Sequence, residues 1–432
     1  MRICVIGTGC VGLVVGSCLA DGGHDVICVD KDKTRIDVLQ SGRAPIHEPG
    51  LADMITRNLA SNRLQFTTAL PDAVAASAII FLAVGTPEGD GGVTDLSQIM
   101  TAARDIAACV DGYKVIAIRS TVPIGTAKAL THTIRQFAPA DASFDIVSNP
   151  EFLSAGSAID NFRNPQRLVI GTSSPRALAM IQEVYRPLDL LDRPMVITTN
   201  ETAETIKYTA NTMLALKISF MNETANLCEA VGADVRDVAL ALGLDRRLGA
   251  GFLQPGPGFG GSCLPKDVAS LSQQALEHGC RFQLAETIIE VNSRQRRVVV
   301  DKTRKALGTL ADKTITLLGL SFKPDTNDVR QSPAMHIAKA LLSEGASINA
   351  YDPAANVEAR KVIPEMHYFD DPYSACDGSD MVMVLTEWRQ LRDLDLAEVK
   401  RRVRCPNMYD ARNIFSRQRM QELGFSYLGT GC

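Results

Sequence analysis

The stretch from Arg2 to Asp30 decides the fold of the first part of the chain. An apolar run, Arg2–Ile6, leads into Gly-Thr-Gly-Cys-Val-Gly at residues 7–12, and an Ala/Leu-rich segment follows. A second apolar run, over residues 26–29, ends on Asp30. This order predicts a strand, a glycine turn, a helix and a second strand. Gly7 would make the tight turn, Gly9 would let the main chain approach a pyrophosphate, and Gly12 would let helix and strand pack closely.

Asp30 follows the glycine turn at the distance at which an acidic residue can bind a ribose diol. Together with the strand and the helix on either side of the turn, it predicts a Rossmann-like site for a dinucleotide. A carboxylate at this position would repel a 2′-phosphate, so we expect NAD rather than NADP. Lys31, Lys33 and Arg35 follow and would soften that repulsion.

Three further strand-to-helix turns carry polar residues. Predicted strands over residues 78–84, 114–118 and 145–147 lead into Gly85-Thr86-Pro87, into a turn with Thr121, and into a turn with Glu151. Ligands bind at the carboxyl ends of parallel strands in doubly wound sheets, which makes Thr121 and Glu151 candidate site residues. Both residues also suit the first turn of a helix, so helix capping is an equally good explanation.

Residues 200–231 contain neither Gly nor Pro and have apolar residues at helical spacing, which predicts one long helix. Lys207 and Asn211 are one turn apart and would share a face, so both could contact the same ligand. A lysine on a helix is more often simply solvated. A helix of this length often spans domains or forms the core of a dimer.

Residues 256–267 read Gly-Pro-Gly-Phe-Gly-Gly-Ser-Cys-Leu-Pro-Lys-Asp. The glycines and the first proline exclude regular structure, and a helical pattern begins at Asp267 and continues to about residue 307. Cys263 would therefore lie just before a helix N-terminus, where the helix dipole and the neighbouring Lys266 favour thiolate over thiol. The alternative is a tight turn that contains a small buried cysteine.

Residues 314–352 repeat the order strand, turn, helix and strand, and the second strand again ends on an acid, Asp352. The turn is longer, lacks the glycine fingerprint and carries Lys323. We therefore expect this domain to bind a phosphorylated group other than a second dinucleotide, held by Lys323 and Arg330. The chain is predicted to be an α/β protein with two Rossmann-like doubly wound domains, residues 1–197 and 309–432, joined by a long-helix central region, residues 198–308.

The composition narrows the class of protein. The 432 residues are 46% hydrophobic and 22% charged, with a net charge of -4, which is typical of soluble globular proteins and argues against nucleic acid as a partner. Eleven cysteines without a CxxC pair and six histidines without ligand spacing predict reduced thiols and no structural metal. The apolar runs are shorter than the ~20 residues of a membrane helix. We expect a cytoplasmic protein with no membrane partner.

The order of these motifs resembles the UDP-glucose/GDP-mannose dehydrogenase family over nearly the whole chain. The matching segments are 7–12, 84–87, 120–126, 148–153, 204–208, 258–267 and 318–323, and residues 245–253 look like the UDP-glucose branch. The resemblance implies oxidation of the C6 alcohol of a nucleotide sugar to a carboxylate, with two NAD and one water. UDP-glucose is the expected substrate. GDP-mannose, a UDP-N-acetylhexosamine and an inactive nucleotide-sugar sensor remain alternatives.

The resemblance also implies catalytic roles. Lys207, with Asp267 and a water, would take the hydroxyl proton, and Cys263 would trap the aldehyde as a thiohemiacetal that becomes a thioester. Glu151 with Thr121 would activate the hydrolytic water, while Lys207 and Asn211 stabilise the oxyanion.

By the same resemblance, two groups of residues are expected to bind the ligands. The residues expected to bind NAD are Gly7, Gly9, Cys10, Val11, Gly12, Asp30, Arg35, Gly85, Thr86, Thr121, Lys266 and Arg330. The residues expected to bind the nucleotide sugar are Glu151, Phe152, Leu153, Ser154, Lys207, Asn211, Arg247, Phe252, Leu253, Gln254, Pro255, Gly256, Gly260, Phe322, Lys323 and Arg412. Arg247 would reach the sugar from a neighbouring subunit, which implies a homodimer.

Three positions depart from the family pattern. Cys10 stands where Tyr is common, and Arg35 replaces a usual Lys. Ala155 stands where the family usually has Glu, which removes one expected contact to NAD or to the substrate.

Overall fold

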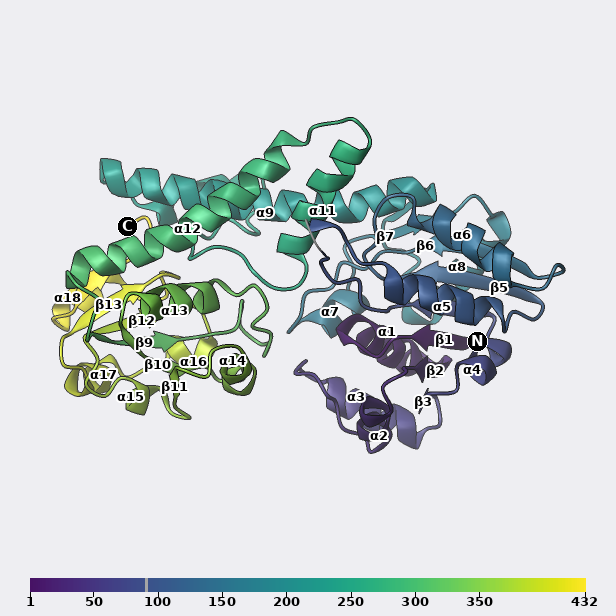
Figure 1. Ribbon diagram of the computed structural model, residues 1–432, viewed down its shortest axis with the longest axis horizontal. Helices are drawn as coiled ribbons and strands as arrows, with labels where there is room; N and C mark the ends of the chain where they lie inside the picture. Colours follow the sequence, from purple (N-terminus) through teal and green to yellow (C-terminus); the bar gives the residue numbers. More distant parts are fainter. Residues whose placement is uncertain (90–91) are drawn as a thin grey trace. The chain divides into compact units, whose positions relative to one another are not determined.

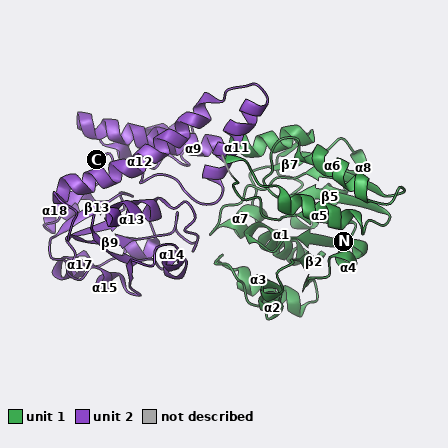
Figure 2. Ribbon diagram, in the orientation of Figure 1, with its two compact units in different colours: residues 1–210 green, residues 211–432 purple. Residues whose placement is uncertain are grey.

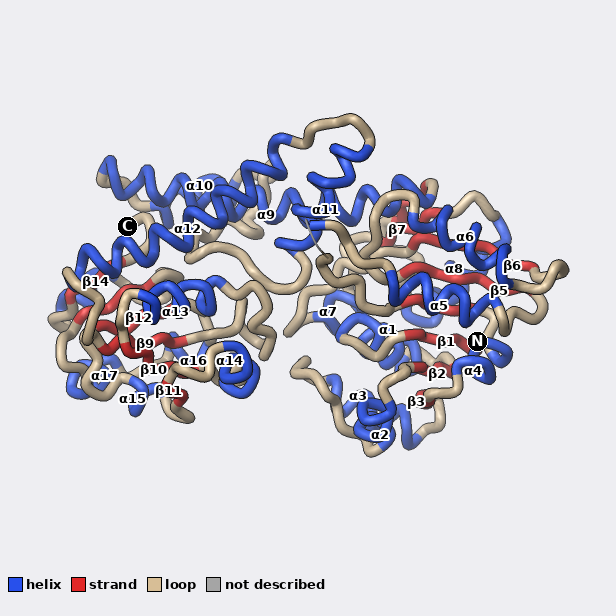
Figure 3. Tube along the Cα trace, in the orientation of Figure 1, coloured by secondary structure: helices blue, strands red, loops and turns tan. Residues whose placement is uncertain are grey.

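The computed structural model describes residues 1–89 and 92–432, and it divides into two compact units, Met1–Ala210 and Asn211–Cys432 (Figure 2). Each unit contains one sheet covered by helices (Figures 1 and 3). The predicted division into domains 1–197, 198–308 and 309–432 stays a prediction.

The first unit is built on an eight-stranded sheet with the order β3-β2-β1-β4-β5-β6-β7-β8. Neighbouring strands are parallel except β6 and β7, which are antiparallel. The strands are β1 Arg2–Ile6, β2 Asp25–Val29, β3 Leu64–Thr67, β4 Ile79–Leu82, β5 Tyr113–Ile118, β6 Ser143–Ser148, β7 Leu168–Gly171 and β8 Met195–Thr198. The helices are α1 Cys10–Asp21, α2 Lys33–Gln40, α3 Leu51–Ala60, α4 Leu70–Ala76, α5 Ser97–Ala107, α6 Thr126–Phe137, α7 Ala158–Arg163 and α8 Pro175–Tyr185, followed by the short η2 Arg186–Leu188.

Helices cover both faces of this sheet because its central strands, β1, β4 and β5, are almost entirely apolar and buried. One core contains Leu13 of α1, Met54 of α3 and Ile181 of α8, packed on alternate residues of the central strands. The other contains Ile99 of α5 and Leu130 of α6, packed on the opposite face. Continuously apolar strands with helices on both faces are typical of a doubly wound sheet.

The second unit begins within helix α9, Asn200–Val231, whose bounds coincide with the predicted helix, and contains a six-stranded parallel sheet. The strand order is β11-β10-β9-β12-β13-β14. The strands are β9 Thr314–Leu318, β10 Ser347–Tyr351, β11 His367–Tyr368, β12 Met381–Val384, β13 Asn407–Asp410 and β14 Ser426–Leu428. The helices after α9 are α10 Val235–Leu244, α11 Leu264–Glu277, α12 Gln283–Leu307, α13 Pro333–Ser343, α14 Asn356–Val362, α15 Pro372–Ala375, α16 Arg389–Arg392, α17 Leu396–Arg402 and α18 Arg417–Glu422.

The two sheets share one topology. In each, the first strand lies between the second strand and the fourth, and the order third-second-first-fourth-fifth-sixth is that of a Rossmann fold. The predicted fold class is therefore confirmed. The point at which the strand order reverses lies beside β1 in the first unit and beside β9 in the second, which is where such sheets bind ligands.

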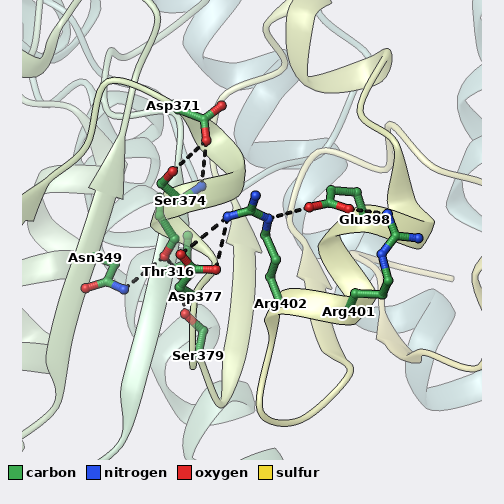
Figure 4. Close-up of polar contacts among 10 residues, drawn as sticks. Thr316, Asn349, Asp371, Ser374, Asp377, Ser379, Glu398, Arg401 and Arg402 are labelled. Carbon is green, nitrogen blue, oxygen red and sulfur yellow. Dashed lines mark hydrogen bonds and ion pairs between the residues drawn. The ribbon is translucent and has the colours of Figure 1, made fainter.

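Polar side chains fix the helices at one face of the second sheet (Figure 4). Asn349 and Thr316 both donate to the carbonyl of Ala375 at the end of α15, over 2.9 and 2.7 Å. Arg402 of α17 contacts Glu398 on its own helix and Asp377 beyond α15. These contacts connect α15 to the sheet and to α17.

The predicted helix from Asp267 to about residue 307 is wrong in two respects. Helix α11 begins at Leu264, three residues earlier, because Pro265 occupies a first-turn position where its missing N–H costs nothing. The helix then ends at Glu277, and Gly279, with a φ of 72°, separates it from α12.

Among the described residues, no helix is both long enough and apolar enough to cross a membrane.

Candidate functional site

The glycine turn after β1 packs tightly on one side and is open on the other. A Cβ on Gly7 would lie 2.5 Å from the carbonyl oxygen of Ala83, and a Cβ on Gly12 would lie 1.9 Å from that of Gly7. A Cβ on Gly9, the N-cap residue of α1, would meet nothing within 4 Å. The space beside Gly9 and the N–H groups at the start of α1 suit a pyrophosphate.

Asp30 lies at the end of β2, directly beside this turn. Its Oδ2 accepts hydrogen bonds from the N–H and the hydroxyl of Thr8, over 2.8 and 2.7 Å, and the guanidinium of Arg35 lies 3.6 Å away. Burial raises the pKa of the Asp30 carboxyl, but these partners and the N–H of Asp32 outweigh that effect and lower it. An ionised carboxylate here can accept hydrogen bonds from a ribose diol, so the residues present fit NAD.

Asp352, the acid at the matching position of the second sheet, has both carboxylate oxygens hydrogen-bonded within the protein. Asp352 accepts hydrogen bonds from the N–H groups of Leu320 and Ser321, over 2.7 and 3.0 Å, and from the indole of Trp388, over 3.1 Å. Two more N–H groups, of residues 354 and 355, bind its other oxygen. Because Asp352 is 3% exposed, it cannot hold a second ribose in the way that Asp30 can.

The predicted site residues fall into two sets, one in each unit. The first unit contains Gly7, Gly9, Cys10, Val11, Gly12, Asp30, Arg35, Gly85, Thr86, Thr121, Glu151, Phe152, Leu153, Ser154 and Lys207. The second unit contains Asn211, Arg247, Phe252, Leu253, Gln254, Pro255, Gly256, Gly260, Cys263, Lys266, Asp267, Phe322, Lys323, Arg330 and Arg412.

In the first unit, Glu151 and Lys207 form a buried ion pair. The Nζ atom of Lys207 lies 3.2 Å from Oε1 of Glu151, and both side chains are 5% exposed. The other carboxylate oxygen of Glu151 accepts a hydrogen bond from the N–H of Leu153. Lys207 also lies 5.3 Å from the ring centroid of Phe152. Lys207 is therefore not a solvated surface lysine, which was the alternative explanation.

Thr121 is close to this pair. A small pocket is lined by Thr121, Ser148, Pro150, Glu204 and Lys207 together with neighbouring residues. The carbonyl of Thr121 accepts a hydrogen bond from the hydroxyl of Thr86, over 2.7 Å. Thr86 and Thr121 thus lie together at the carboxyl ends of β4 and β5, as their place in the sequence predicted.

Arg119, to which the sequence analysis gave no role, holds the turn that carries Glu151. Its Nη1 donates to the backbone and side-chain oxygens of Asn149, each over 2.9 Å, and to the carbonyl of Pro150, over 3.3 Å. Asn149 also accepts from the hydroxyl of Tyr185 and donates to the carbonyl of Val169. The only sequence signal was a cation next to an apolar strand.

Glu204 is a second residue for which the sequence indicated no role. One turn before Lys207 on α9, its carboxylate accepts hydrogen bonds from the N–H groups of Gly125 and Ala127 at the start of α6, over 2.6 and 2.8 Å. Burial raises the pKa of Glu204 to about 7, although the two N–H groups act in the opposite direction. Glu204 thereby fixes the start of α9 to the turn that carries Thr121.

The turn around Ala155 is held by a distant acid. The carboxylate of Glu48, which is 6% exposed, accepts hydrogen bonds from the N–H groups of Gly156 and Ala158, over 2.6 and 2.7 Å. The missing acid at position 155 therefore leaves the backbone of this turn fixed, because the ordering carboxylate comes from more than 100 residues earlier in the chain.

In the second unit, each of four glycines in the loop 256–261 lies against another group. A Cβ on Gly256 would lie 2.8 Å from the guanidinium of Arg412, and one on Gly258 would lie 2.7 Å from Oδ1 of Asn292. A Cβ on Gly260 would lie 2.3 Å from the carbonyl oxygen of Gln331, and one on Gly261 would lie 2.9 Å from the ring of Phe322. The loop thus brings the predicted substrate residues Gly256, Gly260, Phe322 and Arg412 into one region.

Cys263 follows this loop as the N-cap residue of α11, and it is exposed. The prediction that it precedes a helix N-terminus is confirmed, and the alternative of a buried cysteine is wrong. Cys4 and Cys18 show the contrast, because burial raises the pKa of each thiol to about 12. An exposed thiol at a helix N-terminus is the environment in which a cysteine becomes nucleophilic.

One turn into α11, Asp267 is buried between two partners. Its carboxylate lies 2.7 Å from Nζ of Lys266 and accepts a hydrogen bond from Nδ2 of Asn211, over 2.6 Å. Asn211 lies one turn after Lys207 on α9. Two of the predicted catalytic residues, Asn211 and Asp267, are therefore in direct contact in the second unit.

The remaining predicted residues differ in how they are held. Arg412 donates to the carbonyl of Leu385 over 2.9 Å and pairs with Glu387. The side chain of Arg330 pairs with Asp328, while its carbonyl accepts the N–H of Gly261. The Arg247 side chain is 88% exposed and pairs with Asp245 on its own turn. Among the described residues, no group of three or more His, Cys, Asp or Glu side chains could hold a metal ion.

Comparisons with known proteins agree with this arrangement. Residues 1–189, 201–294 and 316–417 match the NAD binding, central and UDP binding domains of the UDP-glucose/GDP-mannose dehydrogenase family. The chain is 46% identical to the UDP-glucose 6-dehydrogenase TuaD of Bacillus subtilis over 431 residues, which cover 100% of this chain and 93% of the relative. It is also 46% identical to the UDP-glucose 6-dehydrogenase of Rhizobium meliloti over 435 residues, which cover 100% and 99%.

Among solved structures, a UDP-glucose dehydrogenase from Pyrobaculum islandicum matches with a TM-score of 0.93 and 34% identity, over 100% of this chain and 97% of that chain. A UDP-D-ManNAc dehydrogenase from Pyrococcus horikoshii matches with a TM-score of 0.88 and 25% identity, over 100% and 99%.

Proposed function

Since this chain belongs to the UDP-glucose/GDP-mannose dehydrogenase family and its first domain is an NAD-binding domain, we propose that it oxidises C6 of UDP-glucose to the carboxylate of UDP-glucuronate. The two curated relatives of 46% identity carry the name UDP-glucose 6-dehydrogenase, which favours this substrate over other nucleotide sugars. The observation that carries the proposal is Cys263, an exposed thiol at the start of α11 that directly follows the close-packed loop 256–261.

NAD bound beside Gly9 and Asp30 would accept the hydride that leaves C6 in each of two oxidations. In the first oxidation, Asp267 takes the proton of the C6 hydroxyl through a water, and the ammonium of Lys207 stabilises the oxygen as it loses that proton. The thiolate of Cys263 then adds to the aldehyde carbon, and the resulting oxyanion takes up a proton to give a thiohemiacetal. Loss of the second hydride and of the hydroxyl proton leaves a thioester on Cys263.

Water then hydrolyses the thioester. Glu151 takes a proton from this water, assisted by Thr121, and the new C–O bond forms as the C–S bond breaks. The donors Lys207 and Asn211 stabilise the oxyanion of the tetrahedral intermediate. The products are the carboxylate and the free thiolate of Cys263. The buried Glu151–Lys207 pair supports this assignment, because it keeps a carboxylate and an ammonium within reach of one another.

The nucleotide sugar is proposed to bind through the second set of residues: Phe252 to Gly256, Gly260, Phe322, Lys323 and Arg412. The match of residues 316–417 to a UDP binding domain supports this assignment. Asp352 also supports the assignment of a nucleotide sugar to this unit. Its carboxylate is already hydrogen-bonded within the protein, so it is not free to bind the ribose of a dinucleotide.

A homodimer is the proposed assembly. Met213, Phe220 and Leu227 follow one another at intervals of seven residues on α9, and each is more than half exposed. Leu240 and Leu244 of α10 are also exposed, at 63% and 76%. A row of large apolar side chains on a long helix is typical of a helix-to-helix interface. The exposed side chain of Arg247 would then leave Asp245 and reach the substrate of the neighbouring subunit.

The substrate is tested by following NADH formation with UDP-glucose, GDP-mannose, UDP-N-acetylglucosamine and UDP-N-acetylmannosamine. We expect turnover with UDP-glucose and two NADH for each sugar oxidised. Turnover of GDP-mannose without turnover of UDP-glucose would contradict the assignment, and no reaction with any of the four would favour a binding protein.

A location in the cytoplasm is also proposed, on the ground that the cysteines of the described residues are free thiols.

A further inference from the structure

The loop 256–261 is held by side-chain amides from two helices. The N–H of Gly256 donates to Oδ1 of Asn222 on α9, over 2.8 Å, and its carbonyl accepts from Nε2 of Gln295 on α12, over 2.9 Å. Asn222 and Gln295 are 0% and 2% exposed. The amide of Asn226 donates to Oε1 of Gln295 over 3.1 Å and so fixes its orientation.

Phe259 is held by a single amide at both of its backbone groups. Its N–H donates to Oδ1 of Asn292 on α12, over 2.8 Å, and its carbonyl accepts from Nδ2 of Asn292, over 3.1 Å. Asn292 therefore pairs with Phe259 as a neighbouring strand would. Arg296, one turn along α12, donates to the same carbonyl over 3.1 Å.

The hydrogen bonds between the loop and the two helices constrain both the loop and the side chains that hold it. Gly258 has a φ of 119°, and a side chain there would collide with the oxygen of Asn292 that binds Phe259. A free segment with glycine at 256, 258, 260 and 261 would sample many conformations. Buried amides cost free energy unless they are hydrogen-bonded, and when satisfied they specify one conformation. Asn292 and Gln295 use both the oxygen and the nitrogen of their amides, whereas Asn222 uses only its oxygen among the described residues. Asn222, Asn292 and Gln295, here called the amide clamp, provide that specification.

We propose that the amide clamp is a set of positioning residues for Cys263. By fixing the backbone at Gly256 and Phe259, it holds the segment that leads into α11, so that the thiol stays at the N-terminus of that helix and the loop keeps one shape against the nucleotide sugar. The kinetic part of this inference rests on the proposed function, whereas the part that concerns the loop and the thiol does not.

Three variants test the clamp. Asn292→Leu removes both hydrogen bonds to Phe259, and Asn292→Asp keeps the acceptor but loses the donor. Thr303→Val is the matched control, because Thr303 is a buried polar residue on the same helix that donates to the carbonyl of Val299 and to the sulfur of Met383. All three are made in the full chain and compared first for cooperative thermal unfolding.

The first two measurements do not depend on the substrate. Hydrogen exchange of the peptide that contains residues 256–262 should be faster in Asn292→Leu than in wild type, with Asn292→Asp between them. Alkylation of Cys263 by iodoacetamide, scored against the exposed Cys280, should slow by about threefold in Asn292→Leu, because the thiol leaves the helix N-terminus for part of the time.

The third measurement is steady-state kinetics with UDP-glucose and NAD. We expect kcat/KM for UDP-glucose to fall by about 100-fold in Asn292→Leu and less in Asn292→Asp, because displacement of reacting groups by about 1 Å has effects of this size. The KM for NAD and all values for Thr303→Val should stay near wild type. If Asn292→Leu does not fold, Asn292→Asp carries the test.

The outcomes separate the possible failures. Faster exchange with unchanged alkylation of Cys263 and unchanged kinetics would overturn the proposal, because the amides would then stabilise the loop without positioning the thiol. Equal losses in Thr303→Val would also overturn it. If wild type oxidises no nucleotide sugar, the proposed function fails, and the exchange and alkylation measurements still decide whether the clamp positions Cys263.

Discussion

The ammonium of Lys207 lies 3.2 Å from the carboxylate of Glu151, and neither side chain is more than 5% exposed. Removal of one partner would leave an uncompensated buried charge. Lys207→Met is therefore expected to lower the free energy of unfolding by about 3–5 kcal/mol and to abolish NADH formation. Denaturation in urea and the NADH assay measure the two effects. Lys128→Met, at an exposed lysine of the same unit, should change neither, and a Lys207→Met protein of wild-type stability would contradict the burial of this pair.

Cys263→Ser should stop the reaction between its two oxidations. The hydroxyl of serine is far less acidic than a thiol, so the aldehyde is not carried forward to an ester. NADH should be released at no more than about one per sugar, as measured in a single-turnover experiment with excess enzyme. Cys280→Ser is the matched control, because Cys280 is also exposed in the second unit. Two NADH per sugar at a near-normal rate in Cys263→Ser would exclude the thioester route.

Glu204 should make stability depend on pH below neutrality. Burial raises its pKa from the ordinary value of 4.5 to about 7, so in this interval the folded state holds a proton that the unfolded state has lost. Stability from this group is therefore present below about pH 4.5 and declines as the pH rises to about 7. In Glu204→Gln the group no longer titrates, and this decline should be absent.

The comparison uses urea unfolding of both proteins between about pH 5 and pH 8. The free energy of unfolding of wild type, relative to Glu204→Gln, should fall over the lower part of this range and level off above about pH 7. Glu290→Gln, at an exposed position of α12, should run parallel to wild type. Parallel curves for wild type and Glu204→Gln would show that Glu204 is already ionised throughout.

The apolar row on α9 makes the assembly testable. Phe220→Asp places a charge in the middle of the row formed by Met213, Phe220 and Leu227, and it should convert a dimer to a monomer in sedimentation velocity experiments. Phe137→Asp introduces the same change at a half-exposed phenylalanine of α6, outside the row, and should leave the assembly unchanged. A wild-type protein that sediments as a monomer would refute the dimer.

The parts of the fold that the sequence predicted are those set by local patterns. The glycine turn at residues 7–12, Asp30 and the bounds of α9 each depend on neighbouring residues, and each lies where it was expected. The sequence pattern predicts the start of α11 at Asp267, three residues too late, because Leu264-Pro265-Lys266 resembles a continuation of the glycine loop, whereas proline is favoured in the first turn of a helix.

The site residues for which the sequence indicated no role have one property in common, which is that each contacts a distant part of the chain. Glu48 binds N–H groups 108 and 110 residues away, Arg119 binds Asn149 thirty residues away, and Asn292 binds Phe259 thirty-three residues away. These partners meet only after the sheets and long helices have formed. Each polar residue by itself looks like an ordinary solvated side chain, and no local spacing indicates which distant backbone group it binds.

Asp352 sets a limit on how the second sheet could be re-engineered. A designer who wished to install a dinucleotide site there would start from the correct strand order and from an acid at the correct position. That acid would first have to be released from Leu320, Ser321 and Trp388, and the donors left behind would need new acceptors. A change of ligand specificity in this domain would thus require the buried residues around Trp388 to be redesigned first, and the surface residues only afterwards.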